Sequence, residues 1–216
     1  MKHSFNTNPP HSQHTMENMK AIFRATEETF NKHKNAKNIE IEFRVGKIAR
    51  NGSFDPNIGK AWYDAFVKSL KGYKKWEDIK VSEYEVYYGE NNKRTTIDSD
   101  DNRTTVTKKR VKNIDVRTEG LPFDVRMSVS TETPDEENED EVYEKVVTKK
   151  RWSFVRKGLS IDITQTSGEN DIDSEEEFVY NVEFEIMDPK SVDDKSKLYN
   201  HIYKIYDLFR CASTSS

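Results

Sequence analysis

Apolar and polar residues alternate strictly in several segments of the chain, which is the pattern of β-strands with one apolar face. In residues 39–45, Ile39, Ile41, Phe43 and Val45 fall on one face, and two glutamates and an arginine fall on the other. The same period of two recurs in the segments Ser82–Tyr88, Arg103–Val111, Phe123–Ser130, Tyr143–Val155, Leu159–Thr166 and Phe178–Ile186. The connections are rich in Asp, Asn, Gly or Glu, as antiparallel hairpins require. This pattern predicts a meandering antiparallel β-domain.

Three further segments have apolar residues at the spacing of an amphipathic helix. They are Met16–Lys34, Ile58–Leu70 and Ser191–Arg210. Each carries an apolar stripe that must be buried against another element.

The polar faces of the strands carry charge of both signs, and two arrangements would explain them. An open antiparallel sheet with a solvated outer face is the simpler one. In the other, the strands close into a barrel, the apolar faces point outwards beneath the helices, and the charged faces line a polar tunnel. Periodicity alone does not choose between them, but the concentration of carboxylates on some strands and of cations on others favours the barrel.

Composition supports a folded protein with an unusually polar surface, inside or outside. Of 216 residues, 34% are charged and 33% hydrophobic, but 11% are aromatic, which argues against general disorder. The net charge is −4 and the pI about 5.8, which argues against a simple basic nucleic-acid-binding domain. We expect one domain over residues 16–210, between a disordered leader at 1–15 and a frayed tail at 211–216.

The single cysteine, Cys211, permits no intrachain disulfide, and no apolar run is long enough to cross a bilayer. An intracellular protein without a membrane role is expected. A P-loop, a Gly-rich dinucleotide motif, a serine elbow and a CxxC pair do not occur in the sequence. One cysteine and scattered histidines argue against a zinc site and against thiol catalysis.

Two glutamate pairs are the candidate metal ligands. Residues two apart on a strand share a face about 6–7 Å apart, so Glu40/Glu42 and Glu183/Glu185 would form an oxygen cluster if their strands were neighbours. Four converging carboxylates repel one another unless a cation is present, and a hard ion such as Mg²⁺ or Mn²⁺ fits such a set. The spacing by itself is weak evidence, because Glu83/Glu85 has it too and is interpreted as a solvated strand face.

Cationic side chains on other strands are candidates for binding a multiply charged anion. Lys149 and Arg151 share a face, and Arg126 lies among short polar neighbours in the middle of a strand. Arginine in a confined polar space makes fork-like contacts to phosphate oxygens. Cross-strand ion pairs on a wet surface are the alternative explanation. Acidic strands for a metal and basic strands for phosphate are together what metal-assisted phosphoanhydride hydrolysis requires.

Three motifs in order, IEIEFRVGK (Ile39–Lys47), KKRWSFVRKGLSIDITQT (Lys149–Thr166) and YNVEFEIMD (Tyr180–Asp188), resemble those of a known family. The family is the metal-dependent RNA triphosphatases of fungi, protists and large DNA viruses, within the triphosphate tunnel metalloenzymes. The resemblance implies an eight-stranded antiparallel barrel with a hydrophilic interior, flanked by about three helices. The broader group typically has ExExK in its first motif, where this chain has Arg44.

The resemblance also implies roles for individual residues. Glu40, Glu42, Glu183 and Glu185 would bind Mg²⁺ or Mn²⁺, and Lys149 and Arg151 would contact the γ-phosphate. Asp162 would lie near the metal or its waters, and Arg126 matches a phosphate-binding arginine on a middle strand. Glu132 is the candidate for orienting the attacking water. The further candidate tunnel cations are Arg94 and Lys108.

The function expected from these motifs is that of an RNA 5′-triphosphatase, which removes the γ-phosphate from nascent mRNA in the first step of cap formation. Two alternatives stay open at this stage: a tripolyphosphatase or nucleoside triphosphatase of the same fold, and a non-catalytic polyanion-binding barrel. Guanylyl transfer would fall to a separate guanylyltransferase. The expected location is the nucleus, or a cytoplasmic replication site or virion if the protein is viral.

Overall fold

The computed structural model describes residues 11–136, 142–168 and 178–213. Residues 1–10, 137–141, 169–177 and 214–216 lie outside the described residues. The helices and strands in chain order are α1 (His11–His33), β1 (Ile39–Ile48), β2 (Phe54–Asp55), α2 (Lys60–Gly72), β3 (Asp78–Gly89), η1 (Glu90–Asn92), β4 (Lys93–Asp98), β5 (Arg103–Val116), β6 (Asp124–Pro134), β7 (Tyr143–Arg156), β8 (Leu159–Ser167), β9 (Phe178–Ile186), η2 (Pro189–Ser191) and α3 (Lys195–Ser213).

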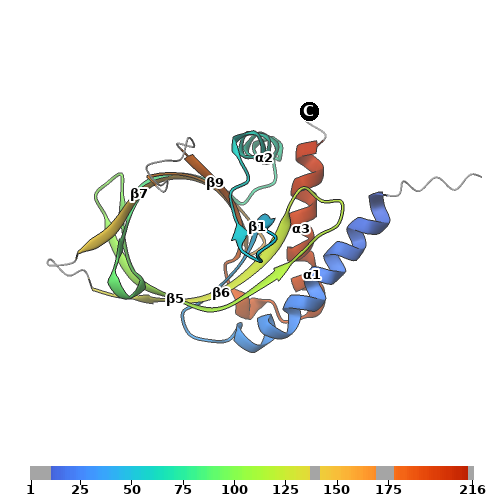
Figure 1. The fold of residues 1–216 in the computed structure, drawn as a ribbon, viewed down its shortest axis with the longest axis horizontal. Coiled ribbons are helices and arrows are strands. Elements are labelled where there is room, and N and C mark those ends of the chain that lie inside the picture. The colour runs from blue at the N-terminus through green and yellow to red at the C-terminus, as the bar shows by residue number, and fades with distance from the viewer. Residues whose placement is uncertain (1–10, 137–141, 169–177, 214–216) are drawn as a thin grey trace, which may run out of the picture.

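Eight of the strands form a closed antiparallel barrel. The hydrogen-bonded order is β1-β6-β5-β4-β3-β7-β8-β9, and β9 pairs again with β1 through Phe43 and Phe184, which closes the ring (Figure 1). The short strand β2 pairs with the C-terminal end of β1, at Lys47 and Ile48, and is not part of the ring. The expected eight-stranded barrel is confirmed, and the open sheet is excluded.

The hydrophobic core lies between one side of the barrel wall and the three helices (Figure 1). The outward-facing side chains of β1, β6, β8 and β9 are buried there, among them Phe43, Met127 and Phe184. They pack against the apolar stripes of the helices, for example Ile22 of α1 and Ile205 of α3. The apolar faces of these strands thus point out beneath the helices, which leaves their polar faces for the interior.

The opposite side of the barrel has no such cover within the part of the chain that the structure describes. Ile79 and Val81 of β3 face outwards and remain 45% and 47% exposed. Glu83 and Glu85, on the same outward face, are exposed as well, as expected for a solvated strand face. Helical cover of the barrel is therefore one-sided.

Element boundaries differ from the expectations at a few places. Helix α1 begins at His11, inside the stretch 1–15 for which no structure was expected, and α3 continues to Ser213. Strand β2 was missed because two residues are too short for a pattern, and β4 was missed because Lys93–Asp98 contains a single aliphatic side chain, Ile97.

No helix of the described ranges combines the length and the apolar character needed to cross a membrane.

Candidate active site

The glutamate pairs of β1 and β9 lie side by side because these strands close the barrel. Glu42 is opposite Glu185 in the register, and Arg44 is opposite Glu183. The Nη2 atom of Arg44 lies 2.7 Å from Oε1 of Glu42 and 2.8 Å from Oε1 of Glu183. One guanidinium therefore bridges carboxylates from both motifs, and the buried position of Glu42 keeps this contact away from bulk water.

A second cation links the first motif to β6. The ammonium of Lys108 on β5 contacts the carboxylate of Glu40 and lies 2.9 Å from Oε1 of Glu132. Ser130 donates a hydrogen bond of 3.0 Å from Oγ to Oε2 of Glu40. Although burial favours the neutral amine, Glu40, Glu42 and Glu132 together raise the pKa of Lys108. Lys108 is therefore a charged constituent of the inner wall.

The motif on β7 and β8 places its charged residues opposite the glutamates of β9. Arg151 lies 3.6 Å from Asp162 and 3.7 Å from Glu183, and its Nε donates to Oγ1 of Thr164 at 3.3 Å. The carboxylate of Asp162 accepts a 2.6 Å hydrogen bond from Ser160 Oγ. Lys149 is two residues before Arg151 and so shares its face. It is also close enough to Glu183 to lower the pKa of that carboxyl.

Arg126 is held in place by a partner that the sequence did not indicate. Its Nε and Nη2 donate to the two carboxylate oxygens of Asp115 on β5, at 2.6 and 2.8 Å. Its guanidinium carbon also lies 4.5 Å from the centre of the Phe54 ring on β2. Phe54 can approach this closely because residue 46 is glycine: a Cβ there would lie 2.7 Å from the Phe54 ring and 2.2 Å from the Asp55 carbonyl oxygen.

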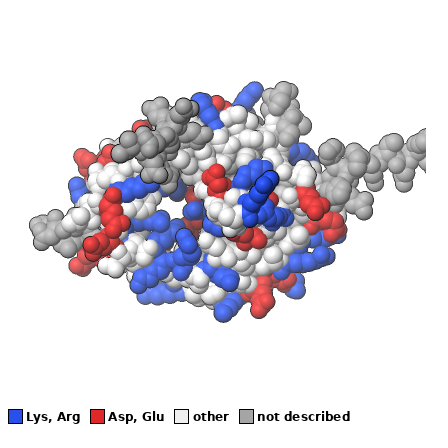
Figure 2. Space-filling model, viewed as in Figure 1, with Lys and Arg blue, Asp and Glu red and all other residues white. Residues whose placement is uncertain are grey.

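The remaining candidate, Arg94 on β4, faces the same interior. It is opposite Tyr88 in the register and lies over the Tyr88 ring at 5.2 Å. Burial opposes ionisation of Glu132, but Lys108, with a smaller contribution from Arg94, lowers the pKa of Glu132. The space-filling view along the barrel has Lys and Arg side chains projecting into the opening from several sides (Figure 2). All the residues expected in the site thus lie on the inner wall.

Tyr84 is an inner-wall residue that the sequence analysis missed. It is opposite Lys149 in the register, and the guanidinium of Arg151 lies 5.7 Å from its ring centre. Burial raises the pKa of Tyr84, so its hydroxyl stays protonated and can donate a hydrogen bond. A signal was available, because assigning Glu83 and Glu85 to the outward face places Tyr84 on the inward one.

The carboxylates carry more negative charge than their neighbours balance. Burial, together with Glu183, raises the pKa of Glu42 to about 8. Burial, together with Glu40 and Asp162, raises the pKa of Glu185 to about 7. Burial acts in the same direction on Glu183, but Arg44 and Arg151 outweigh it and hold the pKa of Glu183 at about 2. An added divalent cation would favour the ionised form of both Glu42 and Glu185.

The donor set fits a hard divalent metal ion. Within the described ranges, no three carboxylate, imidazole or thiol groups are drawn together closely enough to enclose one. Arg44 and Lys108 lie between the glutamates instead. The four glutamates nevertheless offer only oxygen ligands, which Mg²⁺ and Mn²⁺ prefer, and the raised pKa values of Glu42 and Glu185 indicate a deficit of positive charge.

Comparison with known proteins identifies the family. The model of the mRNA triphosphatases, described as the mRNA capping enzyme beta chain, matches residues 73–206. The chain belongs to this family. The protein is accordingly an RNA 5′-triphosphatase of mRNA capping, as the three sequence motifs predicted, and triphosphatases of this tunnel type depend on a metal ion.

Solved structures of RNA triphosphatases have the same fold. The Schizosaccharomyces pombe triphosphatase Pct1 aligns with a TM-score of 0.71 at 16% identity, over 90% of this chain and 91% of its own. Pct1 in complex with the Spt5 CTD aligns with a TM-score of 0.64 at 17% identity, over 91% and 89%. The mimivirus capping enzyme triphosphatase aligns with a TM-score of 0.56 at 13% identity, over 87% and 97%. Among curated proteins, no relative matches the chain.

Proposed function

We propose that the barrel interior is the catalytic tunnel of this triphosphatase and that it binds the 5′-triphosphate end of RNA together with Mg²⁺ or Mn²⁺. The observation that carries the proposal is the opposition of charge across β7, β8 and β9. Arg151 lies within 3.7 Å of both Asp162 and Glu183, so cations and metal-binding oxygens meet in one place. Hydrolysis of a phosphoanhydride needs that combination, because both a metal ion and basic side chains neutralise the negative charge of the γ-phosphate.

The glutamates of β1 and β9 are the proposed metal ligands: Glu40, Glu42, Glu183 and Glu185. The bound ion would supply Lewis-acid stabilisation of the phosphate oxygens. Arg44 bridges Glu42 and Glu183, which holds these two carboxylates close together and favours ionised Glu183. Lys108 contacts Glu40 and Glu132 and so holds the Glu40 ligand beside β6. These two cations therefore position the ligands.

The basic side chains of the other strands are the proposed phosphate-binding groups. Arg126, Lys149 and Arg151 stabilise the charge that develops on the γ-phosphate during in-line attack by water. Asp115 and Phe54 keep the Arg126 guanidinium in one orientation. Arg94 faces the same interior and extends this charge towards the β4 side.

Two carboxylates have proposed roles outside the ligand set. Glu132 orients the attacking water, because it lies on the inner wall and the charge of Lys108 outweighs its burial and lowers the pKa of its carboxyl. Asp162, beside Arg151, interacts with the metal or its waters. The product is RNA with a 5′-diphosphate end, which is the substrate that a guanylyltransferase would cap.

Release of labelled phosphate from γ-³²P-labelled triphosphate RNA in the presence of Mn²⁺ or Mg²⁺ tests the proposal. We expect metal-dependent release by the wild type and a loss of about 100-fold or more for Glu42→Gln and Glu185→Gln. Glu85→Gln is the matched control, because it changes an ExE glutamate on the outer face and should leave the rate unchanged. Full activity of Glu42→Gln would sink the metal assignment.

Competition between RNA, ATP and tripolyphosphate in the same assay resolves the substrate preference. We expect RNA to inhibit the hydrolysis of ATP and of tripolyphosphate at a low concentration. Inhibition of RNA hydrolysis by ATP or tripolyphosphate should need a higher concentration. Preferential turnover of tripolyphosphate would instead favour the alternative of a tripolyphosphatase with the same metal site.

A further inference from the structure

A second cavity lies outside the barrel, between α2, α3 and the turn that joins β7 to β8. Its volume is about 790 Å³, within the range of ligand sites in proteins. The floor and walls are formed by apolar and aromatic side chains, which include Leu70, Trp76, Leu159, Val192 and Leu208. None of the residues with proposed catalytic roles lines it. The cavity is therefore a separate compartment from the tunnel.

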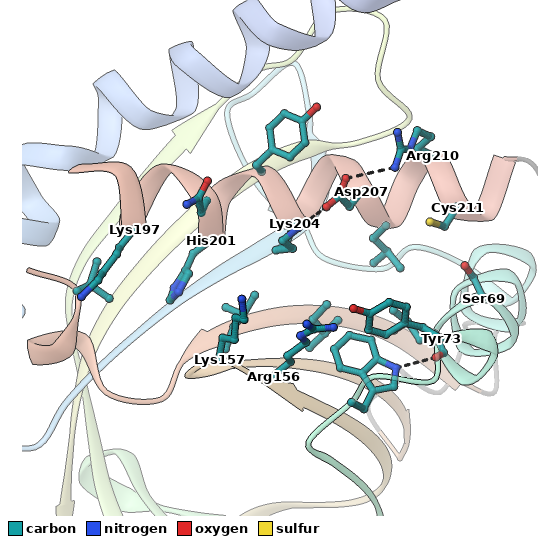
Figure 3. A pocket seen from close by; sticks show the side chains of 18 of the residues that line it. Ser69, Tyr73, Arg156, Lys157, Lys197, His201, Lys204, Asp207, Arg210 and Cys211 are labelled. Atoms are coloured by element: carbon teal, nitrogen blue, oxygen red, sulfur yellow. Dashed lines mark hydrogen bonds and ion pairs between the residues drawn. The ribbon is translucent and has the colours of Figure 1, made fainter. Parts of the chain in front are cut away.

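Cations dominate the rim of this cavity. Figure 3 shows Arg156 and Lys157 rising from the strand side, while Lys197, His201 and Lys204 extend from α3 towards the same space. The lining residues include five Lys or Arg side chains and one carboxylate, Asp207. In a chain with a net charge of −4, such a local excess of positive charge favours an anionic ligand.

Two polar groups at the cavity are buried without a partner among the described residues. Nη1 of Arg156 and Nδ1 of His201 make no hydrogen bond, although neither atom is open to solvent. Arg156 is held against the Tyr73 ring, with its guanidinium carbon 5.2 Å from the ring centre. Buried donors of this kind are ordinarily satisfied in a native structure. Arg156 and His201 therefore have hydrogen-bonding capacity at this cavity that no described residue uses.

The spacing of the cations indicates a ligand with several anionic groups in a row. Lys197 and Lys204 are seven residues apart on one face of α3, so the positive charge there extends over about 10 Å. An extended peptide of about three residues covers that length. The present carboxylate partners of the α3 lysines are Asp193 for Lys197 and Asp207 for Lys204, and both ion pairs are at the surface, where such pairs are weak and exchange readily.

We propose that this cavity is a docking site for an acidic peptide segment of a partner protein, with one large apolar or aromatic side chain of the peptide inserted between α2 and α3. The inserted side chain would bury its surface against Leu70, Leu159 and Leu208. Aspartates and glutamates on either side of it would pair with the cations of α3 and of the β7–β8 turn. Affinity would fall with ionic strength, because the charged rim is exposed.

Fluorescence anisotropy of a labelled peptide tests this proposal. The probe is about ten residues long, a run of aspartates and glutamates with one central tryptophan, so that it extends beyond the row of cations at both ends. Two companion peptides replace the tryptophan by alanine, or the acids by their amides. We expect binding of the first peptide only, and no displacement by excess tripolyphosphate, because the tunnel is a different compartment.

Two kinds of variant locate the binding. Lys157→Asn combined with Lys197→Glu alters the rim charge, and asparagine tolerates the positive φ of 51° at position 157. Ser69→Trp fills the cavity from α2 without changing its charge. Each should weaken binding at least about tenfold. The matched control is Lys37→Asn with Lys32→Glu, which makes the same change in net charge at exposed positions that do not line the cavity.

Triphosphatase activity and the unfolding midpoint serve as readouts of folding for every variant, and neither should change. The proposal is overturned if the tryptophan peptide does not bind, if its alanine form binds equally well, or if the two cavity variants bind like the wild type. Displacement by tripolyphosphate would place the peptide in the tunnel instead, and displacement by micromolar ATP would indicate a small anionic ligand. The binding assay needs no turnover, so its failure is separable from a failure of the catalytic assignment.

Discussion

Arg126 and Asp115 form a two-pronged ion pair inside the barrel, with donor–acceptor distances of 2.6 and 2.8 Å. The pair fixes the plane of a guanidinium to which we assign phosphate binding. Asp115 itself is thus a positioning residue.

This pair leads to a prediction of coupled kinetic effects. Arg126→Ala should lower kcat about 100-fold, as the loss of one preorganised charge-stabilising group does in other enzymes. Asp115→Asn should lower it about tenfold, because the guanidinium stays but loses its fixed orientation. The double variant Asp115→Asn/Arg126→Ala should be no slower than Arg126→Ala alone, since the effect of Asp115 passes through Arg126. Multiplicative losses in this cycle would show that Asp115 acts by another route.

Metal binding should raise thermal stability through the same glutamates. At a metal concentration of 100 times Kd, binding to the folded state alone stabilises by about 2.7 kcal/mol. We expect Mn²⁺ to raise the unfolding midpoint of the wild type and of Glu85→Gln. It should leave Glu185→Gln nearly unchanged. Differential scanning fluorimetry with and without EDTA measures this, and an equal shift for all three proteins would argue for a site elsewhere.

In the absence of metal, stability should fall as pH rises from about 5 to 8. The folded-state pKa values of Glu42 and Glu185, about 8 and about 7, lie above the ordinary value of 4.5. The folded state therefore binds protons that the unfolded state releases, and this contribution is complete below pH 4.5 and is lost as pH rises through the folded values. Glu183 acts in the opposite sense, but only below pH 4.5.

Urea denaturation in EDTA at a series of pH values between 5 and 8 measures this dependence. Glu42→Gln should flatten it, because glutamine does not titrate, and Glu85→Gln should leave it as in the wild type. A stability that rises over this interval in the wild type would contradict the prediction.

Gly46→Ala should damage the site from the end of β1 that pairs with β2. The added Cβ would meet the Asp55 carbonyl oxygen at 2.2 Å, a backbone atom that cannot move aside alone, so β2 must shift. Overpacking of this kind costs about 1–3 kcal/mol, and Phe54 would also leave the face of Arg126. We expect a lower urea midpoint together with a higher KM for RNA. Gly72→Ala, where an added Cβ meets nothing within 4 Å, is the control.

Much of the barrel was predictable because its strands alternate so regularly. In residues 39–45 the apolar set is buried under the helices and the polar set faces the tunnel, as the period of two requires. Lys93–Asp98 was missed because Thr95, Thr96 and their neighbours carry almost no apolar contrast. The β-bulge between Arg110 and Lys112 could not be predicted either, because the apolar and polar alternation in this strand does not indicate where an extra residue is inserted.

The candidate site was predictable as a set of residues but not as a set of contacts. The glutamate pairs could be chosen because motifs on different strands repeat one spacing, and the closure of β1 on β9 brings them together. That Arg44 bridges Glu42 and Glu183, and that Lys108 reaches Glu40 from β5, depends on the register and curvature of the barrel. Asp115 had no motif around it at all. The roles of the individual site residues remain predictions.

Closure of the ring by β1 and β9 also constrains how the protein is made. These are the first and last strands of the barrel in sequence, and both contribute metal-binding candidates. During synthesis, β1 leaves the ribosome long before its partner exists, and a contact between such distant segments forms late and slowly. Until β9 emerges, the nascent chain has neither a sealed sheet edge nor a complete set of acidic ligands. A truncated translation product should therefore be both inactive and prone to edge-to-edge association, so that folding and activity are acquired in a single final step.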